Sequence, residues 1–187
     1  MNGKGPERNG LERNGPVSKR MFLGWWINGI VAFVIALILH NPLVIEAVPG
    51  GILDHQSAPD AASVDAIQTA WQAAGLMDQA SIAMSADLIF IGLFGVGVVL
   101  GGLYFGAKDA RGLKVLGWIA LVSGIVFLAT DYSETIAQYM QLSRMAGDDG
   151  FAALASSMGP LKVASFLVAF VALIVALIWK RLSQPSI

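Results

Sequence analysis

Four long apolar stretches dominate the pattern of hydrophobic and polar positions along this chain. They cover residues 22–48, 81–107, 113–131 and 161–179. A helix needs about 20 apolar residues to cross the roughly 30 Å hydrocarbon layer of a bilayer, and each stretch approaches or exceeds that length. The pattern therefore predicts an all-α fold. We expect an integral membrane bundle of four transmembrane helices, forming a single domain over residues 21–182.

Two shorter segments between these stretches have a helical period but weaker hydrophobicity. In residues 61–77 and 131–147, apolar side chains recur at spacings of three and four, which places them on one helix face. We expect two short amphipathic helices over the extracytoplasmic face of the bundle. Pro42 should kink or loosen the first span. The polar run 148–150 and the Gly-Pro pair 159–160 should separate a short helical piece from the fourth span.

Composition supports a membrane protein. Hydrophobic residues make up 56% of the chain and charged residues 13%, whereas soluble domains average about 45–50% apolar and about 25% charged residues. The mean hydropathy is +0.66. The chain has no cysteine, which excludes disulfides, thiolate metal sites and thiol redox chemistry.

The first 20 residues are polar and rich in glycine and proline, so we expect a disordered cytoplasmic tail over residues 1–20. The apolar run that follows continues to Leu39. That is longer than the apolar core of a signal peptide, about 7–15 residues, and no cleavage motif follows at the right distance. We therefore expect the first span to be retained.

Basic residues are concentrated on one side of the predicted membrane. All of the 12 lysines and arginines except Arg144 and Lys162 lie in the N-terminal tail, the turn at 108–114 or the C-terminal end. The positive-inside rule then predicts that both termini are cytoplasmic and that the long acidic connections face outward. We expect an integral protein of a bacterial inner (plasma) membrane.

The second span, 81–107, is unusually rich in small residues. At about 100° per residue, its glycines fall on two separate faces, so that two neighbouring helices can approach it closely. Together with glycines of the third span, the predicted helix-packing residues are Gly92, Gly95, Gly97, Gly101, Gly102, Gly106, Gly117 and Gly124. The second span should therefore be the centre of the bundle.

Each span also carries an ionisable residue near its extracytoplasmic end. If the small-residue faces point inward, these residues converge as a polar cluster, which consists of His40, Asp87, Asp131 and Lys162. Ionisable groups at membrane depth are costly and need partners, so the cluster is a candidate ligand or ion site. Two alternatives remain open: an ion-pair network that fixes helix order, and residues that reach the lipid headgroups without forming a common site.

Other chemistry has weaker support. Only one histidine lies within a predicted span, whereas a membrane-embedded b-type haem usually needs two, and Glu-x-x-His pairs for a di-iron site are absent. Zinc-protease, phosphate-loop and Ser-His-acid patterns are also absent. We therefore expect no cofactor, no metal site, no nucleic-acid partner and no enzymatic activity.

The sequence leaves two functional hypotheses. The first is a non-catalytic accessory or interaction subunit of a larger membrane assembly, with lipids and either other membrane subunits or further copies of itself as partners. It is motivated by small size, the lack of a catalytic set and the two packing faces of the second span. The alternative is a small ion, proton or solute transporter that uses the polar cluster.

Overall fold

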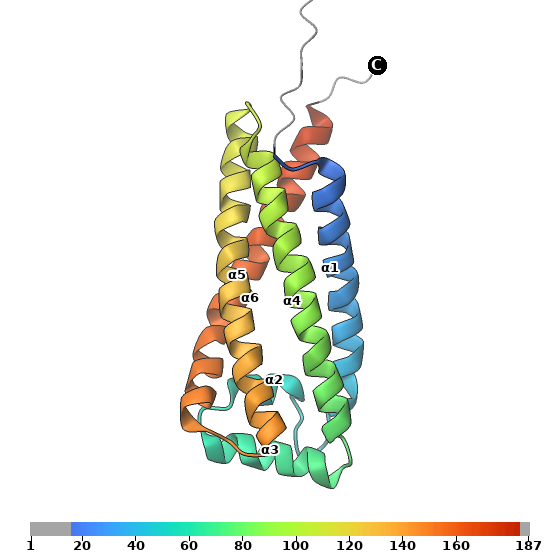
Figure 1. Cartoon of the computed structure of the whole chain (residues 1–187), viewed down its shortest axis with the longest axis vertical. Coiled ribbons are helices and arrows are strands. Elements are labelled where there is room, and N and C mark those ends of the chain that lie inside the picture. Colours follow the sequence, from blue (N-terminus) through green and yellow to red (C-terminus); the bar gives the residue numbers. More distant parts are fainter. Residues whose placement is uncertain (1–15, 184–187) are drawn as a thin grey trace, which may run out of the picture.

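The computed structural model describes residues 16–183, and this part of the chain is almost entirely helical (Figure 1). Its elements in chain order are α1 (Lys19–His40), the 3-10 helix η1 (Asn41–Leu43), α2 (Ile52–Ser57), α3 (Ala61–Ala73), α4 (Met77–Gly106), α5 (Arg111–Arg144) and α6 (Asp149–Leu182). Most of the predicted tail lies outside the described residues. Its last two residues belong to α1, because the Ser18 side chain caps this helix by accepting from the Met21 nitrogen at 3.1 Å.

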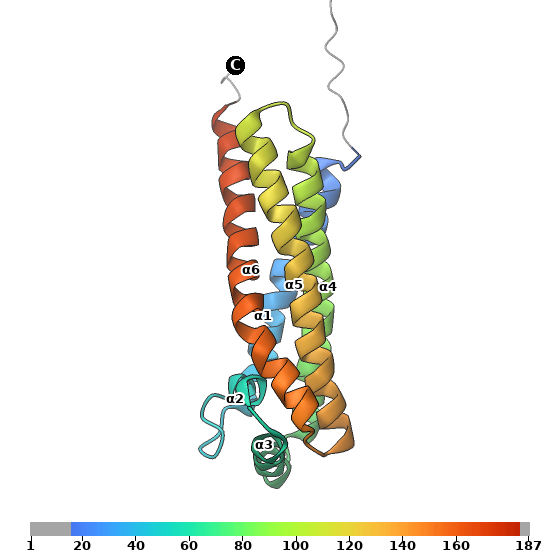
Figure 2. The same ribbon diagram turned by 90° about the vertical axis from the view of Figure 1, so that its left-hand side faces the viewer.

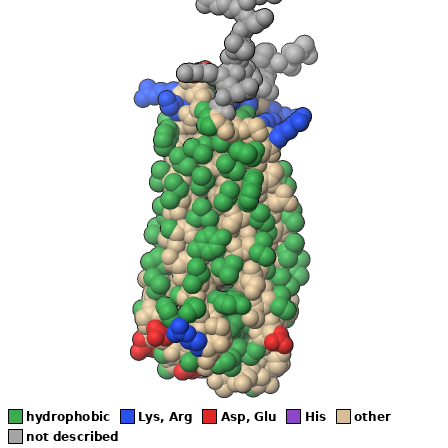
Figure 3. Space-filling model, viewed as in Figure 1, with side chains coloured by type: hydrophobic (Ala, Val, Ile, Leu, Met, Phe, Trp, Pro, Cys, Tyr) green, Lys and Arg blue, Asp and Glu red, His purple; other side chains and the backbone are tan. Residues whose placement is uncertain are grey.

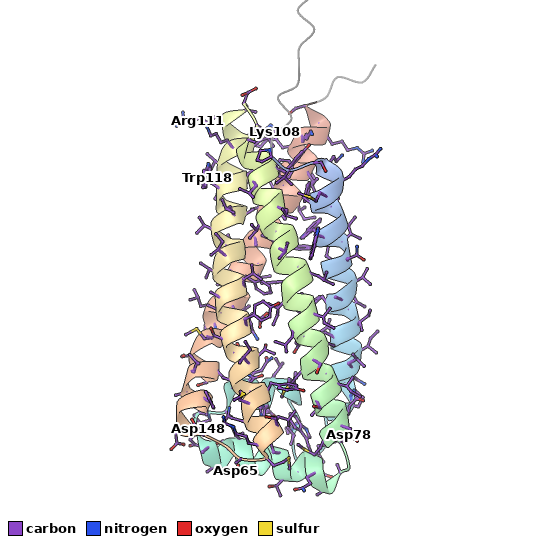
Figure 4. The ribbon with its side chains drawn as sticks, in the orientation of Figure 1. Asp65, Asp78, Lys108, Arg111, Trp118 and Asp148 are labelled. Carbon is purple, nitrogen blue, oxygen red and sulfur yellow. The ribbon has the colours of Figure 1, made fainter. Side chains whose placement is uncertain are left out.

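Four of the helices are long and apolar enough to cross a membrane: α1 extended through η1, α4, α5 and α6. Apolar side chains cover the flank of the bundle between its two ends, as Figure 3 shows. Basic residues lie at one end of this flank and acidic residues, with one basic group, at the other. In Figure 4, Lys108 and Arg111 mark the end where α1 begins and α6 ends, and Asp65, Asp78 and Asp148 mark the opposite end, where α3 lies.

Helix α4 lies between α1 and α5, and α6 packs along α5. The backbone of α1 reaches one face of α4 so closely that a Cβ added at Gly97 would lie 2.5 Å from the Trp26 nitrogen. On the other face, a Cβ at Gly102 would lie 2.6 Å from the Leu121 nitrogen of α5. Glycine therefore allows both close approaches, one on each side of the helix.

The other predicted packing glycines also lie at helix contacts, with one exception. Gly92 and Gly95 face Tyr132 and Leu128 of α5, Gly101 faces Leu173 of α6 and Phe22 of α1, Gly117 faces the α4 backbone, and Gly124 faces Val98. A Cβ at Gly106 would meet nothing within 4 Å. Helix α4 ends at this residue, and a Cβ there would meet no neighbouring helix.

The predicted second amphipathic helix is not a separate element. Residues 131–144 continue the third span as one helix, α5, which ends where Met145 adopts the left-handed conformation with φ of 51°. The fourth span is also longer than predicted, because α6 begins at Asp149 and passes through Pro160. The Asp148 side chain caps α6 by accepting from the Phe151 nitrogen at 2.9 Å, and contact with α5 holds the helix through the proline.

A small cap closes the end of the bundle opposite the start of α1 and the end of α6. It consists of η1, α2 and α3, which lie beneath the ends of the long helices (Figure 2). Helix α1 ends at His40 rather than continuing to residue 48, because Pro42, the second residue of η1, has no backbone N–H to continue the α-helical hydrogen bonds. Trp71 of α3 is fully buried and donates to the Leu43 carbonyl oxygen at 3.0 Å. An apolar cluster separate from the main core therefore holds the cap against the long helices.

Candidate functional site

The four residues of the predicted polar cluster line one cavity of about 380 Å³. His40 is the last residue of α1, and Asp87, Asp131 and Lys162 come from α4, α5 and α6. The cavity lies in the half of the bundle next to the cap, where α2 also contributes to its wall. Each long helix therefore supplies one ionisable side chain to the same space.

His40 and Asp87 form a pair that joins α1 to α4. The His40 Nε2 atom lies 2.7 Å from Asp87 Oδ2, and the two side chains are 11% and 15% exposed. A histidine and a carboxylate at this distance share a hydrogen bond whether or not the imidazole carries a charge. The Nδ1 atom of His40 is buried and has no hydrogen-bond partner among residues 16–183.

Lys162 joins α6 to α5 through two carboxylates. Its Nζ atom lies 2.6 Å from Glu134 Oε1 and 3.5 Å from Asp131 Oδ1. Glu134 is fully buried, so its attraction to Lys162 is screened little by solvent. The shorter contact shows that Glu134 is the closer partner of the lysine, and that Asp131 is held at a greater distance.

Glu134 was absent from the predicted cluster, although the sequence contained a signal for it. It follows Asp131 by three residues, which places both carboxylates on the same face of one helix. The prediction ended the third span at residue 131 and assigned Glu134 to a surface helix. The continuation of α5 instead buries Glu134, Gln138 and Gln141 in the half of the bundle nearest the cap.

Acidic groups outnumber basic ones in the cluster. Asp87, Asp131 and Glu134 lie beside one lysine and one histidine, so three carboxyl groups share two basic partners. A carboxylate can accept about four hydrogen bonds. Within residues 16–183, the nearest ionic partner of Asp131 is the lysine nitrogen at 3.5 Å, and Glu134 Oε2 is buried without a partner. The site therefore has spare capacity to hold positive charge.

Four phenylalanines, one from each long helix, form the apolar part of the cavity wall. They are Phe33, Phe90, Phe127 and Phe166. Their ring centroids lie close together: 5.0 Å for Phe33 and Phe90, 5.9 Å for Phe90 and Phe127, and 5.8 Å for Phe127 and Phe166. We call these four residues the phenylalanine wall. It closes the cavity on the side toward the middle of the bundle.

The cavity reaches the surface where its exposed lining residues lie, on α1, α2 and α6. Figure 1 shows α6 running obliquely behind α4 and α5, away from α1 toward the cap. Aromatic contacts still bridge the two helices, with ring centroids 5.6 Å apart for Trp26 and Phe170 and 5.5 Å apart for Phe33 and Phe166. Nearer the cap, Leu37 and Leu167 line the cavity and are more than half exposed. We call this gap the lateral mouth.

Comparison with known proteins gives no further assignment, since no protein-family model, no curated protein and no solved structure matches the chain. Within residues 16–183, no group of three His, Cys, Asp or Glu side chains is placed to hold a metal ion. The predicted packing glycines, of which all but Gly106 face a neighbouring helix, do not line the cavity. The chemistry available at the site is thus that of paired carboxylates, an imidazole and an ammonium beside an aromatic wall.

Proposed function

We propose that this chain is a small membrane transporter for a cation or for protons, with the cavity as its binding site. The observation that supports this proposal most is the convergence of His40, Asp87, Asp131 and Lys162 on one cavity within helices that can span a membrane. Carboxylates and histidines inside membrane segments are costly and are typical of proton and ion pathways. The excess of carboxyl groups over basic groups in the cluster also favours the entry of a positive charge.

The predicted role as an accessory subunit has less support. Its main argument was the pair of glycine faces on the second span, which suggested surfaces for neighbouring proteins. Both faces contact helices of the same chain, α1 at Gly97 and α5 at Gly102. Internal packing therefore accounts for these glycines without a partner, and the accessory role stays a prediction with no additional observation in its favour.

We further propose that the termini are cytoplasmic and that the cap faces outward, as in a bacterial inner membrane. The charges support this orientation, because Lys108 and Arg111 lie at the end where α1 begins and α6 ends, and Asp65, Asp78 and Asp148 lie at the cap end. The cavity would then lie in the outer half of the bilayer. A substrate would reach it from outside or from the outer lipid leaflet.

Proton flux into liposomes tests the proposed function. Purified protein is reconstituted with a pH-sensitive dye inside, and a potassium diffusion potential drives the flux. We expect the wild type to acidify the lumen faster than protein-free liposomes, and Asp87→Asn to slow this flux by about tenfold, because it removes a charged acceptor from the pathway. Asp109→Asn, in the exposed turn between α4 and α5, is the matched control. Flux equal to that of protein-free liposomes would contradict proton transport.

A further inference from the structure

We propose that the cavity binds an amphipathic organic cation, in which an ammonium group is attached to an apolar, preferably aromatic, body. The ammonium would lie between Asp87 and Asp131, and the body would pack against the phenylalanine wall. The molecule would enter from the bilayer through the lateral mouth. This inference rests on the proposed function, because it names the class of cation that the transport site takes.

The arrangement of charges favours a cation over an anion. Lys162 is the only lysine or arginine among the cavity-lining residues, and its ammonium lies closest to Glu134, at 2.6 Å. Asp131, in contrast, is 95% buried, lines the cavity, and has its nearest ionic partner at 3.5 Å. Asp87 uses Oδ2 for His40 and has a second oxygen available. An entering ammonium group could therefore donate hydrogen bonds to two carboxylates that have few partners. An anion would instead be repelled by both carboxylates.

The size and lining of the cavity favour an organic molecule over a bare ion. A volume of about 380 Å³ lies within the range of small-molecule sites, about 300–1,000 Å³. Most of its wall is apolar, so a metal ion would lose its water shell without gaining enough oxygen ligands. Aromatic faces next to carboxylates also suit an ammonium, since a cation is attracted to the negative face of a ring.

The lateral mouth favours an amphipathic molecule. It lies between α1 and α6, and its exposed residues are leucines and a valine: Leu37, Leu53, Val163 and Leu167. Three of these belong to candidate membrane spans, and Leu53 belongs to α2 at the outer edge. A molecule with an apolar body can concentrate at the bilayer interface and pass between these apolar side chains. A hydrated inorganic ion has no comparable route there.

Binding of three matched compounds tests this inference. The protein is placed in lipid nanodiscs, and the affinities of 4-phenylbutylammonium, 4-phenylbutanol and 4-phenylbutanoate are measured by equilibrium dialysis against empty nanodiscs. The three share a phenyl body and differ in charge. We expect the ammonium compound to bind about tenfold more tightly than the alcohol, as one or two charge-assisted hydrogen bonds would provide, and the carboxylate not to bind.

Substitutions test the contributions of the Asp131 carboxylate and of the lateral mouth separately. Asp131→Asn should lower the affinity for the ammonium compound about tenfold and leave the affinity for the alcohol unchanged. If this variant does not fold, Leu37→Trp provides a second test of the inference, because it fills the lateral mouth without changing any charge. Ile38→Trp is its control: Ile38 is the next residue of α1, is 66% exposed and does not line the cavity. Leu37→Trp should abolish binding, and Ile38→Trp should leave it intact.

The outcomes distinguish the inference from the proposed function. Preferential binding of 4-phenylbutanoate, or equal binding of all three compounds, would overturn the organic-cation assignment. The absence of saturable binding by any of them would also overturn it. In each case, proton flux that depends on Asp87 would still support a transporter. Conversely, saturable binding of the ammonium compound that depends on Asp131, without flux of any kind, would support the ligand class and contradict transport.

Discussion

Single glycines control how closely the helices pack, and two of them on α4 provide a direct comparison. Gly102 and Gly106 are four residues apart, about one helical turn, and both belong to the predicted packing residues. A Cβ at Gly102 would lie 2.6 Å from the Leu121 nitrogen, whereas a Cβ at Gly106 would meet nothing within 4 Å. Backbone cannot move aside as a flexible side chain can, so Gly102→Ala should push α5 away from α4.

We expect Gly102→Ala to lower the free energy of unfolding by about 1–3 kcal/mol, the usual cost of overpacking a well-packed contact. Gly106→Ala should leave stability within about 0.5 kcal/mol of the wild type. Reversible unfolding in mixed micelles with increasing denaturing detergent measures both values. Equal destabilisation by the two variants would show that α4 and α5 are not in the close contact described.

At the residue scale, much of the candidate site was predictable from helical geometry. A rise of about 1.5 Å and a turn of about 100° per residue give the depth and the face of each side chain. These two quantities were enough to group His40, Asp87, Asp131 and Lys162. Glu134 could not be included, because the polar residues after Asp131 resemble a surface helix. Only the position of α6 shows that this face is covered.

At the scale of elements, one buried histidine joins α2 to α3. His55 of α2 is 1% exposed, stacks on Trp71 with a centroid distance of 5.4 Å, and lies 3.3 Å from the Gln68 amide nitrogen. Burial lowers the pKa of His55 from 6.5 to about 4, because it disfavours the charged imidazole. The folded cap therefore binds the proton less readily than the unfolded cap does.

This pKa shift makes the cap sensitive to acid. As the pH falls from 6.5 toward 4, the unfolded cap takes up a proton that the folded cap excludes, so the cap loses up to about 3 kcal/mol of stability. Asp60, which caps α3, does not interfere in this window. Hydrogen bonds to Ser63 lower its pKa below 3.8, so its contribution is lost only at lower pH.

We expect the amide protection factors of residues 52–71 to fall on the order of 100-fold between pH 7 and pH 4.5, after correction for intrinsic exchange rates. The measurement is hydrogen exchange followed by mass spectrometry. His55→Gln keeps a neutral side chain and should remove most of this pH dependence. An equal pH response in the variant would contradict the role of His55.

The number of long helices was predictable, but their lengths and the short helix α2 were not. Four apolar stretches gave the four long helices, and residues 61–77 contain α3. The short helix α2 has no periodic signal, since six residues span less than two turns. Pro160 was a misleading signal: the loss of one backbone donor is a local cost, and packing of α6 against α5 on both sides of it outweighs that cost.

For the molecule as a whole, the proposed orientation can be tested directly because the chain has no cysteine. Single cysteines are introduced at Asp78, on the cap side, and at Asp109, in the opposite turn, and intact cells are treated with a membrane-impermeant maleimide. We expect Asp78→Cys to be labelled at once and Asp109→Cys to be labelled only after permeabilisation. The reverse pattern would place the termini outside and would contradict the positive-inside assignment.

The spatial order of the long helices, α1, α4, α5 and α6, is also their order along the chain. Spans that insert in chain order would therefore each pack beside the one made just before it. Before α6 enters the membrane, Glu134 and Asp131 have neither the Lys162 ammonium nor a helix to shield them from lipid. The final span thus supplies the neutralising charge and encloses the cavity in one step, so an unfinished chain differs chemically from a complete one.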